Sequence, residues 1–135
     1  MSDTESGCEP EDDLSVQDPT LLYRWVPPTH IRRTDSGVEC RDGAFKNFPN
    51  KETNRMSVVL QDTLEALDRL PATILADRPG YGLVAVTAAD VRAEKQKVLR
   101  SPQSHELAHG DVWGGKTPAR RRLLAQKATW VIEPE

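Results

Sequence analysis

Two histidines and a glutamate within residues 105–109 are the side chains of this chain best suited to chemistry. They follow the pattern His-Glu-x-x-His, with His105, Glu106 and His109 at its fixed positions. On a helix, residues four positions apart share one face, so both imidazoles could bind one Zn²⁺. Glu106 could then take a proton from a zinc-bound water. The pattern therefore predicts a zinc-dependent hydrolase or peptidase, with Glu106 catalytic and the two histidines as metal ligands.

A catalytic zinc site needs a third protein ligand, and the sequence leaves that ligand open. The extended spacing with a third downstream histidine is absent, because Val112 and Gly115 occupy those positions. Pro102 and Gly110 also limit a helix here to about two turns. We therefore expect no cofactor, with zinc as the alternative. The remaining candidates for the third ligand are Glu133, Glu135, His30, Cys40 and Asp111.

His30 is the third histidine of the chain. It lies between Pro27-Pro28 and Arg32-Arg33, where a surface turn is the default interpretation. If the fold brought it close to His109, it could form a phosphate- or ribose-binding cluster with neighbouring arginines, since histidine pairs suit proton transfer near neutral pH.

A second motif overlaps the first. Residues 110–117 match G-x-x-x-x-G-K-[ST], the loop whose backbone amides bind phosphates. That loop must follow a buried strand, whereas residues 103–109 are polar, and only residues 118–135 remain for the rest of such a domain. We therefore interpret Gly114-Gly115 as a turn that leads into a capped helix.

A basic segment follows this turn. Five cations are candidates for contact with nucleic acid or phosphate: Lys116, Arg120, Arg121, Arg122 and Lys127. Several bases on one short helix can contact a phosphate backbone. A solvated helix face with surface ion pairs is the competing interpretation.

Charge is distributed unevenly along the chain. Residues 1–20 contain seven acidic residues and no lysine or arginine, whereas the remainder holds 14 acidic and 18 basic residues. Such a segment has too few apolar groups to offset the entropy of ordering, so we predict a disordered acidic tail over 1–20 and one domain over 21–135. The tail either aids solubility or shields a basic face.

The sequence also predicts a cytoplasmic protein. Cys8 and Cys40 do not suggest a disulfide framework, and the acidic N-terminus lacks the basic and apolar regions of a signal peptide. No apolar run is long enough to span a membrane, so we expect no membrane partner.

Hydrophobic patterning predicts an α+β domain with about four or five short strands and three helices. We expect strands over 21–26, 38–40, 83–86, 98–99 and 130–132, while 56–60 fits either a strand or a helix start. The spacing of Leu60, Leu64 and Leu67 predicts a helix over 61–70. Thr87 and Thr117 are expected to cap helices that end near residues 95 and 128.

The chain resembles a set of small uncharacterised bacterial proteins over most of residues 21–132. The matching segments include Leu22-Tyr23-Arg24, Met56-Ser57-Val58, Ala108-His109 and Gly115-Lys116-Thr117. In that pattern the single histidine corresponds to His109, which makes His109 with Lys116 a candidate ligand-contacting turn. The resemblance implies an accessory factor of a bacterial defence or mobile-element system.

The sequence as a whole predicts a non-catalytic factor that docks a protein partner. The small size, the uneven charge and the lack of a complete catalytic set favour this function. A zinc-dependent hydrolase and a nucleic-acid-binding module are the alternatives.

Overall fold

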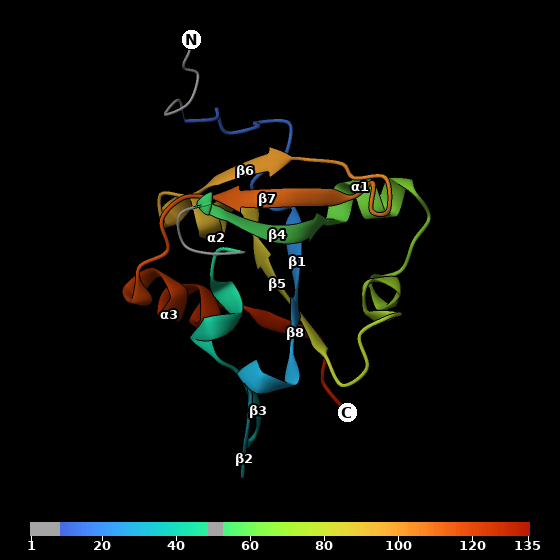
Figure 1. Cartoon of the computed structure of the whole chain (residues 1–135), viewed down its shortest axis with the longest axis vertical. Coiled ribbons are helices and arrows are strands. Elements are labelled where there is room, and N and C mark those ends of the chain that lie inside the picture. The colour runs from blue at the N-terminus through green and yellow to red at the C-terminus, as the bar shows by residue number, and fades with distance from the viewer. Residues whose placement is uncertain (1–8, 49–52) are drawn as a thin grey trace.

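The computed structural model describes residues 9–48 and 53–135, which form an α+β fold (Figure 1). Its strands are β1 (Leu21–Val26), β2 (Ile31–Thr34), β3 (Gly37–Cys40), β4 (Arg55–Leu60), β5 (Gly82–Thr87), β6 (Lys97–Arg100), β7 (His109–Trp113) and β8 (Thr129–Ile132). Its α-helices are α1 (Gln61–Ala66), α2 (Ala88–Ala93) and α3 (Pro118–Lys127). The 3₁₀ helices described in full are η1 (Pro28–His30), η2 (Asp42–Phe45) and η4 (Pro71–Leu75).

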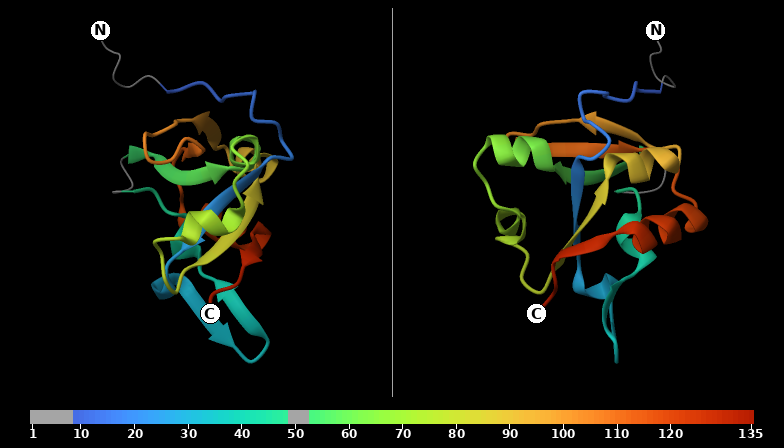
Figure 2. Two further views of the ribbon diagram at one scale, coloured as in Figure 1. Left: turned by 90° about the vertical axis from the view of Figure 1, so that its right-hand side faces the viewer. Right: turned by 180° about the vertical axis from the view of Figure 1, so that it is seen from behind.

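Six of the strands form one antiparallel sheet in the order β6-β7-β4-β1-β5-β8, while β2 and β3 form a separate hairpin. The predicted α+β class is confirmed, although the described residues contain more strands than the four or five expected. The hairpin projects from one end of the molecule (Figures 1 and 2).

The large sheet changes direction between β1 and β4. β1 pairs with β5 along its whole length, from Leu21↔Thr87 to Val26↔Gly82. With β4 it is registered only at Leu22↔Leu60 and Tyr23↔Val59. Figure 1 accordingly shows β4, β6 and β7 running across the molecule while β1 and β5 run down it. This divergence leaves a corner between the two parts of the sheet.

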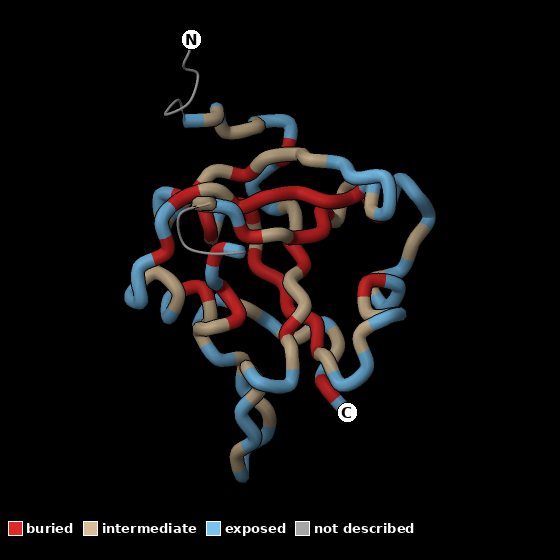
Figure 3. Tube along the Cα trace, in the orientation of Figure 1, coloured by how far each residue is buried: buried red, intermediate tan, exposed pale blue. Residues whose placement is uncertain are grey.

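Apolar residues pack on both faces of the sheet. One cluster contains Leu22, Phe45, Met56, Val112 and Leu124, and therefore packs η2 and α3 against the strands. The other contains Tyr23, Val59, Leu64, Ile74 and Ala108, which packs α1 and η4 against the opposite face. Figure 3 shows this buried interior along the strands. No helix in the described part of the chain has the length and apolar character needed to cross a bilayer.

Two of the predicted helix starts are confirmed by their capping contacts. The Thr87 side chain accepts from Asp90 N, and the Asp90 carboxylate accepts from Thr87 N, forming a capping box. Thr117 caps α3 and Pro118 takes its first position. The helix predicted over 61–70 is shorter, since α1 ends at Ala66. Leu70 is 72% exposed and so gives no apolar face to extend that helix.

Residues 9–20 of the predicted acidic tail pack against the domain, and residues 1–8 lie outside the described residues. Val16 is fully buried, and Asp13 N donates to Val98 O at 2.9 Å. Asp12 and Asp18 both form ion pairs with Arg92. The prediction of disorder is therefore wrong for residues 9–20, because these acids meet basic residues of α2 and β6 and Val16 supplies an apolar anchor.

β7 is the strand that the sequence patterns concealed. Its polar residues His109 and Asp111 face the same side, where Asp111 accepts from Arg55 Nη1 at 2.9 Å. Gly110 points to the other side, and a Cβ there would lie 2.8 Å from Leu60 Cδ2 and 2.9 Å from Leu99 O. The glycine thus permits close strand packing, where the sequence alone suggested a loop.

We predict that Gly110→Ala lowers the free energy of unfolding by about 1–3 kcal/mol, because the new methyl group overlaps both a packed leucine and a backbone carbonyl. Gly115→Ala is the matched control, since a Cβ at Gly115 meets no atom within 4 Å. Urea denaturation of the two variants measures the difference. Equal stabilities for both would contradict the close approach at Gly110.

Candidate functional site

The His-Glu-x-x-His segment does not form a helix. Gln103 and Glu106 exchange two backbone hydrogen bonds of 3.0 Å in a tight turn, and His109 N donates to Glu106 O. β7 then begins at His109 itself. Because the segment is a turn followed by a strand, the helical face on which the zinc prediction depends is not formed.

Glu106 is held by Arg69, which follows α1 in the chain. Both of its carboxylate oxygens accept from the Arg69 guanidinium, and Oε1 also accepts from Ala108 N at 3.2 Å. The hydrogen bond from Arg69 is the main reason that the Glu106 pKa lies below its usual value. Glu106 is therefore a paired carboxylate that ties two chain segments together, and not a free proton acceptor.

His109 lies at the start of β7 and is only 7% exposed. Its Nδ1 lies 3.1 Å from Ser101 O and 2.9 Å from Ser101 Oγ. No hydrogen bond to Nε2 is found among the described residues. The ring is therefore fixed on one side only.

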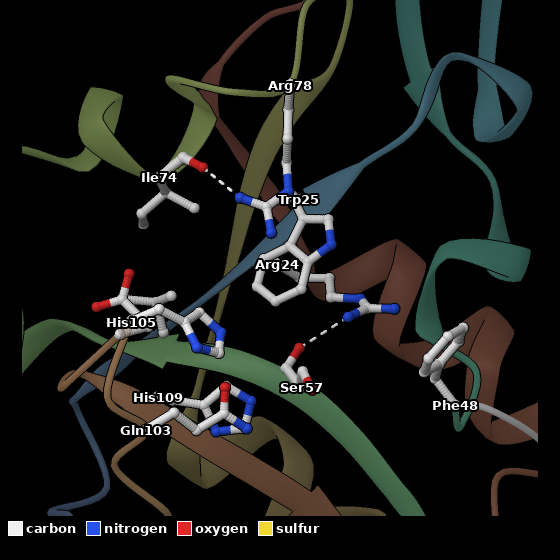
Figure 4. Close-up of a pocket in the computed structure, with 11 residues that line it drawn as sticks. Arg24, Trp25, Phe48, Ser57, Ile74, Arg78, Gln103, His105 and His109 are labelled. Atoms are coloured by element: carbon white, nitrogen blue, oxygen red, sulfur yellow. Dashed lines mark hydrogen bonds between the residues drawn. The ribbon is translucent and has the colours of Figure 1, made fainter.

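Both histidines and Glu106 line a cavity of about 290 Å³ in the corner where β1 leaves β4 (Figure 4). β1 and β4 supply one side of it, and the segments around η4 and the 103–109 turn supply the others. The lining residues are Arg24, Trp25, Phe48, Ser57, Val59, Ile74, Arg78, Gln103, His105, Glu106 and His109. The structure thus brings His105, Glu106 and His109 to one site, although without helical geometry.

Arg24 fills the gap between the diverging strands. Its Nε donates to Ala44 O at 2.9 Å and its Nη1 donates to Ser57 O at 2.8 Å. Burial and the nearby Arg78 lower the pKa of Arg24 to about 10. Arg24 therefore remains a cation at neutral pH, in surroundings with little water.

The Trp25 ring is in contact with two guanidinium groups. The Cζ of Arg24 is 5.0 Å from the ring centroid and that of Arg78 is 4.4 Å from it. Arg78 Nη1 also donates to Ile74 O at 2.6 Å, which fixes the side chain along the cavity wall. The indole face stabilises both cations and holds their planes in place.

The cavity has a positive electrostatic balance. Two arginines line it, and its one carboxylate among the described lining residues belongs to Glu106, which Arg69 already neutralises. The sequence suggested Arg24, with Arg32 and Arg33, only as a possible partner of His30 in a phosphate- or ribose-binding cluster, and it did not suggest Trp25, Ser57 or Arg78 as site residues. Arg24 and Ser57 lie in two of the segments on which the expected resemblance to small bacterial proteins was based.

His30 does not join this site. Its ring packs against the Cα of Gly43, where a Cβ would lie 2.6 Å from the imidazole Cε1. Burial is the largest cause of its lowered pKa, followed by the charges of Lys46 and Arg41. The condition for a cluster of His30 with His109 is therefore not met, since His30 is absent from the lining of the cavity that contains His109.

The candidates for a third zinc ligand are likewise dispersed. Asp111 is paired with Arg55, and burial raises the pKa of the Cys40 thiol to about 12. Across residues 9–48 and 53–135, no group of three histidine, cysteine or acidic side chains is placed to hold a metal ion. Zinc binding stays a prediction. Elemental analysis of the wild type and of His109→Ala tests it, because a zinc site requires about one zinc per chain in the wild type and loss of that zinc in the variant.

The basic segment 116–127 is only partly available to a ligand. Lys116 is buried, and its Nζ donates to Asn47 Oδ1 at 2.5 Å and to Val112 O and Gly114 O at 3.0 Å. Arg121 pairs with Asp42 at 3.6 Å and Lys127 with Glu94 at 3.8 Å. Arg120 donates to Gly115 O, whereas Arg122 is exposed. The five cations therefore do not form one continuous phosphate-binding face.

Comparison with protein-family models, with curated proteins and with solved structures finds no match to this chain. Its site is accordingly interpreted from its own geometry. The resemblance to small bacterial proteins stays a prediction.

We predict that the free energy of unfolding rises as pH increases from about 7 toward 10, in part because of Lys116. Burial lowers its pKa from 10.5 to about 7. Between these values the unfolded chain binds a proton on this amine that the folded chain has released, so raising pH favours the folded state.

Lys116→Met should be less stable than the wild type at pH 9 and should show a weaker rise in stability with pH. The variant is less stable because it loses the three hydrogen bonds that the Lys116 amine donates. Its stability changes less with pH because methionine has no group that titrates. Urea denaturation between pH 7 and 9.5 measures the stability at pH 9 and its change with pH. The titration of Cys40 affects the stability of the wild type and of the variant equally. Identical pH slopes would contradict the lowered pKa.

Proposed function

We propose that this protein binds a small phosphorylated ligand with a planar ring, of the nucleotide class, in the cavity between β1, β4, η4 and the 103–109 turn. The observation that carries the proposal is the pair of guanidinium groups, from Arg24 and Arg78, whose Cζ atoms lie 5.0 Å and 4.4 Å from the centre of the Trp25 ring inside one cavity. Such cations are costly to withdraw from water unless an anion or polar acceptors compensate.

The arginines retain hydrogen-bonding capacity for an anion. A guanidinium has five N–H donors. Arg24 uses Nε and Nη1 on backbone carbonyls, and Arg78 uses Nη1 on Ile74 O. Charge-assisted bonds from the other N–H groups to phosphate oxygens are strong in a cavity with few competing waters.

The other walls favour a planar ring. Phe48 lines the cavity and is 72% exposed, an unusual position for a large apolar side chain without a ligand. Aromatic rings and guanidinium planes both stack on heterocyclic bases. The cavity volume of about 290 Å³ is close to the lower end of typical small-ligand sites. A compact nucleotide therefore suits both its chemistry and its size.

The first test is a calorimetric titration with adenosine 5′-monophosphate, with adenosine as the uncharged comparison. We predict that the nucleotide binds more tightly than adenosine and that added salt weakens the difference. Arg78→Gln should weaken nucleotide binding about tenfold or more, because a charge-assisted hydrogen bond and the stacked cation are both lost.

Arg122→Gln is the matched control, since Arg122 is an exposed arginine of α3 outside the cavity lining. It should leave nucleotide affinity unchanged. Thermal unfolding of each variant confirms that the fold is retained. Absence of nucleotide binding, or an equal loss in both variants, would falsify the proposed site.

The predicted role in docking a protein partner stays a prediction. It now rests on Leu70 and Leu107, which are 72% and 55% exposed and adjoin the two members of the Arg69–Glu106 ion pair. Binding of nucleic acid through α3 also stays a prediction, with Arg122 as its most exposed arginine.

A further inference from the structure

We infer that His109 presents a hydrogen-bond acceptor to the bound ligand, and that the site therefore selects a nucleotide with a free sugar hydroxyl group. This inference rests on the proposed function, because it assumes that the ligand enters the cavity that His109 lines. The arginines select for the phosphate group of the ligand, and His109 adds a preference for a hydroxyl group.

The position of the imidazole proton follows from the contacts of Nδ1. A carbonyl oxygen can only accept a hydrogen bond, so the 3.1 Å contact between Nδ1 and Ser101 O requires a proton on Nδ1. Ser101 Oγ, at 2.9 Å, can accept from the same N–H. With the proton on Nε2 instead, Nδ1 and the carbonyl would face each other with lone pairs. The geometry thus places a proton on Nδ1, so the neutral form of the ring carries its free lone pair on Nε2.

The lone pair on Nε2 requires a hydrogen-bond donor from the ligand. His109 is 7% exposed and lines the cavity, and no described residue hydrogen-bonds its Nε2. A polar atom withdrawn from water costs free energy unless it finds a partner. A ligand that displaces water from the cavity must therefore supply a donor at this position.

The required donor is unlike the group that the arginines bind. A phosphate oxygen accepts hydrogen bonds and would meet the Nε2 lone pair unfavourably, whereas a hydroxyl group can donate to it. Arg24 and Arg78 offer only donors, so they suit the phosphate. Donors on one wall and an acceptor on another distinguish the two ends of a ligand and fix its orientation in the cavity.

The test compares adenosine 5′-monophosphate with its 2′,3′-dideoxy analogue by calorimetric titration. In the wild type we expect the hydroxylated nucleotide to bind about five- to tenfold more tightly, the value of one neutral hydrogen bond with an otherwise unpartnered acceptor. In His109→Phe the two nucleotides should bind equally, since the ring remains and the lone pair is removed.

Ser101→Ala is the control for the tautomer. It removes Oγ but keeps the carbonyl that holds the Nδ1 proton, so the preference for the hydroxylated nucleotide should persist. Loss of that preference would overturn the assignment of the carbonyl as the determining contact. Nitrogen-15 NMR of the wild-type imidazole gives a reading that needs no variant: a proton found on Nε2 in the free protein also overturns the inference.

The two proposals fail in different ways. If neither nucleotide binds the wild type, the proposed function fails and this inference fails with it. If both nucleotides bind the wild type equally well, the cavity is a nucleotide site but His109 does not select a hydroxyl group.

Discussion

The short pairing between β1 and β4 governs the architecture of this protein. After Leu22↔Leu60 and Tyr23↔Val59 the two strands separate, and the backbone acceptors along the gap need other donors. The Arg24 guanidinium supplies them at Ala44 O and Ser57 O. One side chain therefore holds the corner open and satisfies its polar groups, and it also leaves a cation at the cavity wall.

On this side of the molecule, Arg24 and the buried Lys116 hydrogen-bond to neutral oxygens and form no ion pair with a described carboxylate. Arg24 donates to two backbone carbonyls, and Lys116 donates to two carbonyls and to the Asn47 amide. Such acceptors compensate for lost hydration, and Arg24, which stays a cation at neutral pH, keeps a positive charge without a described carboxylate in an ion pair with it. The resulting field favours an anion in the neighbouring cavity, which is why the proposed ligand is phosphorylated.

The Arg69–Glu106 ion pair has a complementary role. It joins the segment after α1 to the turn that carries His105, and so anchors the turn that forms one wall of the cavity. Glu106 forms its ion pair with Arg69, which does not line the cavity. Its negative charge therefore does not cancel the charges of Arg24 and Arg78. The carboxylate that the sequence suggested as a catalytic base thus acts as a structural contact, and the polar character of the cavity rests on its arginines and on His109.

Local sequence signals determined much of the secondary structure. The Thr87–Asp90 capping box, the Thr117-Pro118 helix start and the apolar run in β5 act over a few residues, so they could be identified without knowledge of the fold. The sequence also places both histidines and Glu106 within one short segment. Their proximity at one cavity could therefore be expected from the sequence.

Only the tertiary structure decided what those residues do. β7 could not be recognised because its polar positions are stabilised by distant partners, Arg55 and Ser101, and its glycine by the close approach of Leu60. The order of residues 9–20 likewise depends on Arg92 and on the burial of Val16. Arg24 and Arg78 lie 54 positions apart in the sequence, and only the fold brings both against the Trp25 ring. Charge pairing, strand register and stacking are contacts between segments far apart in the chain, and such contacts leave no local pattern in the sequence.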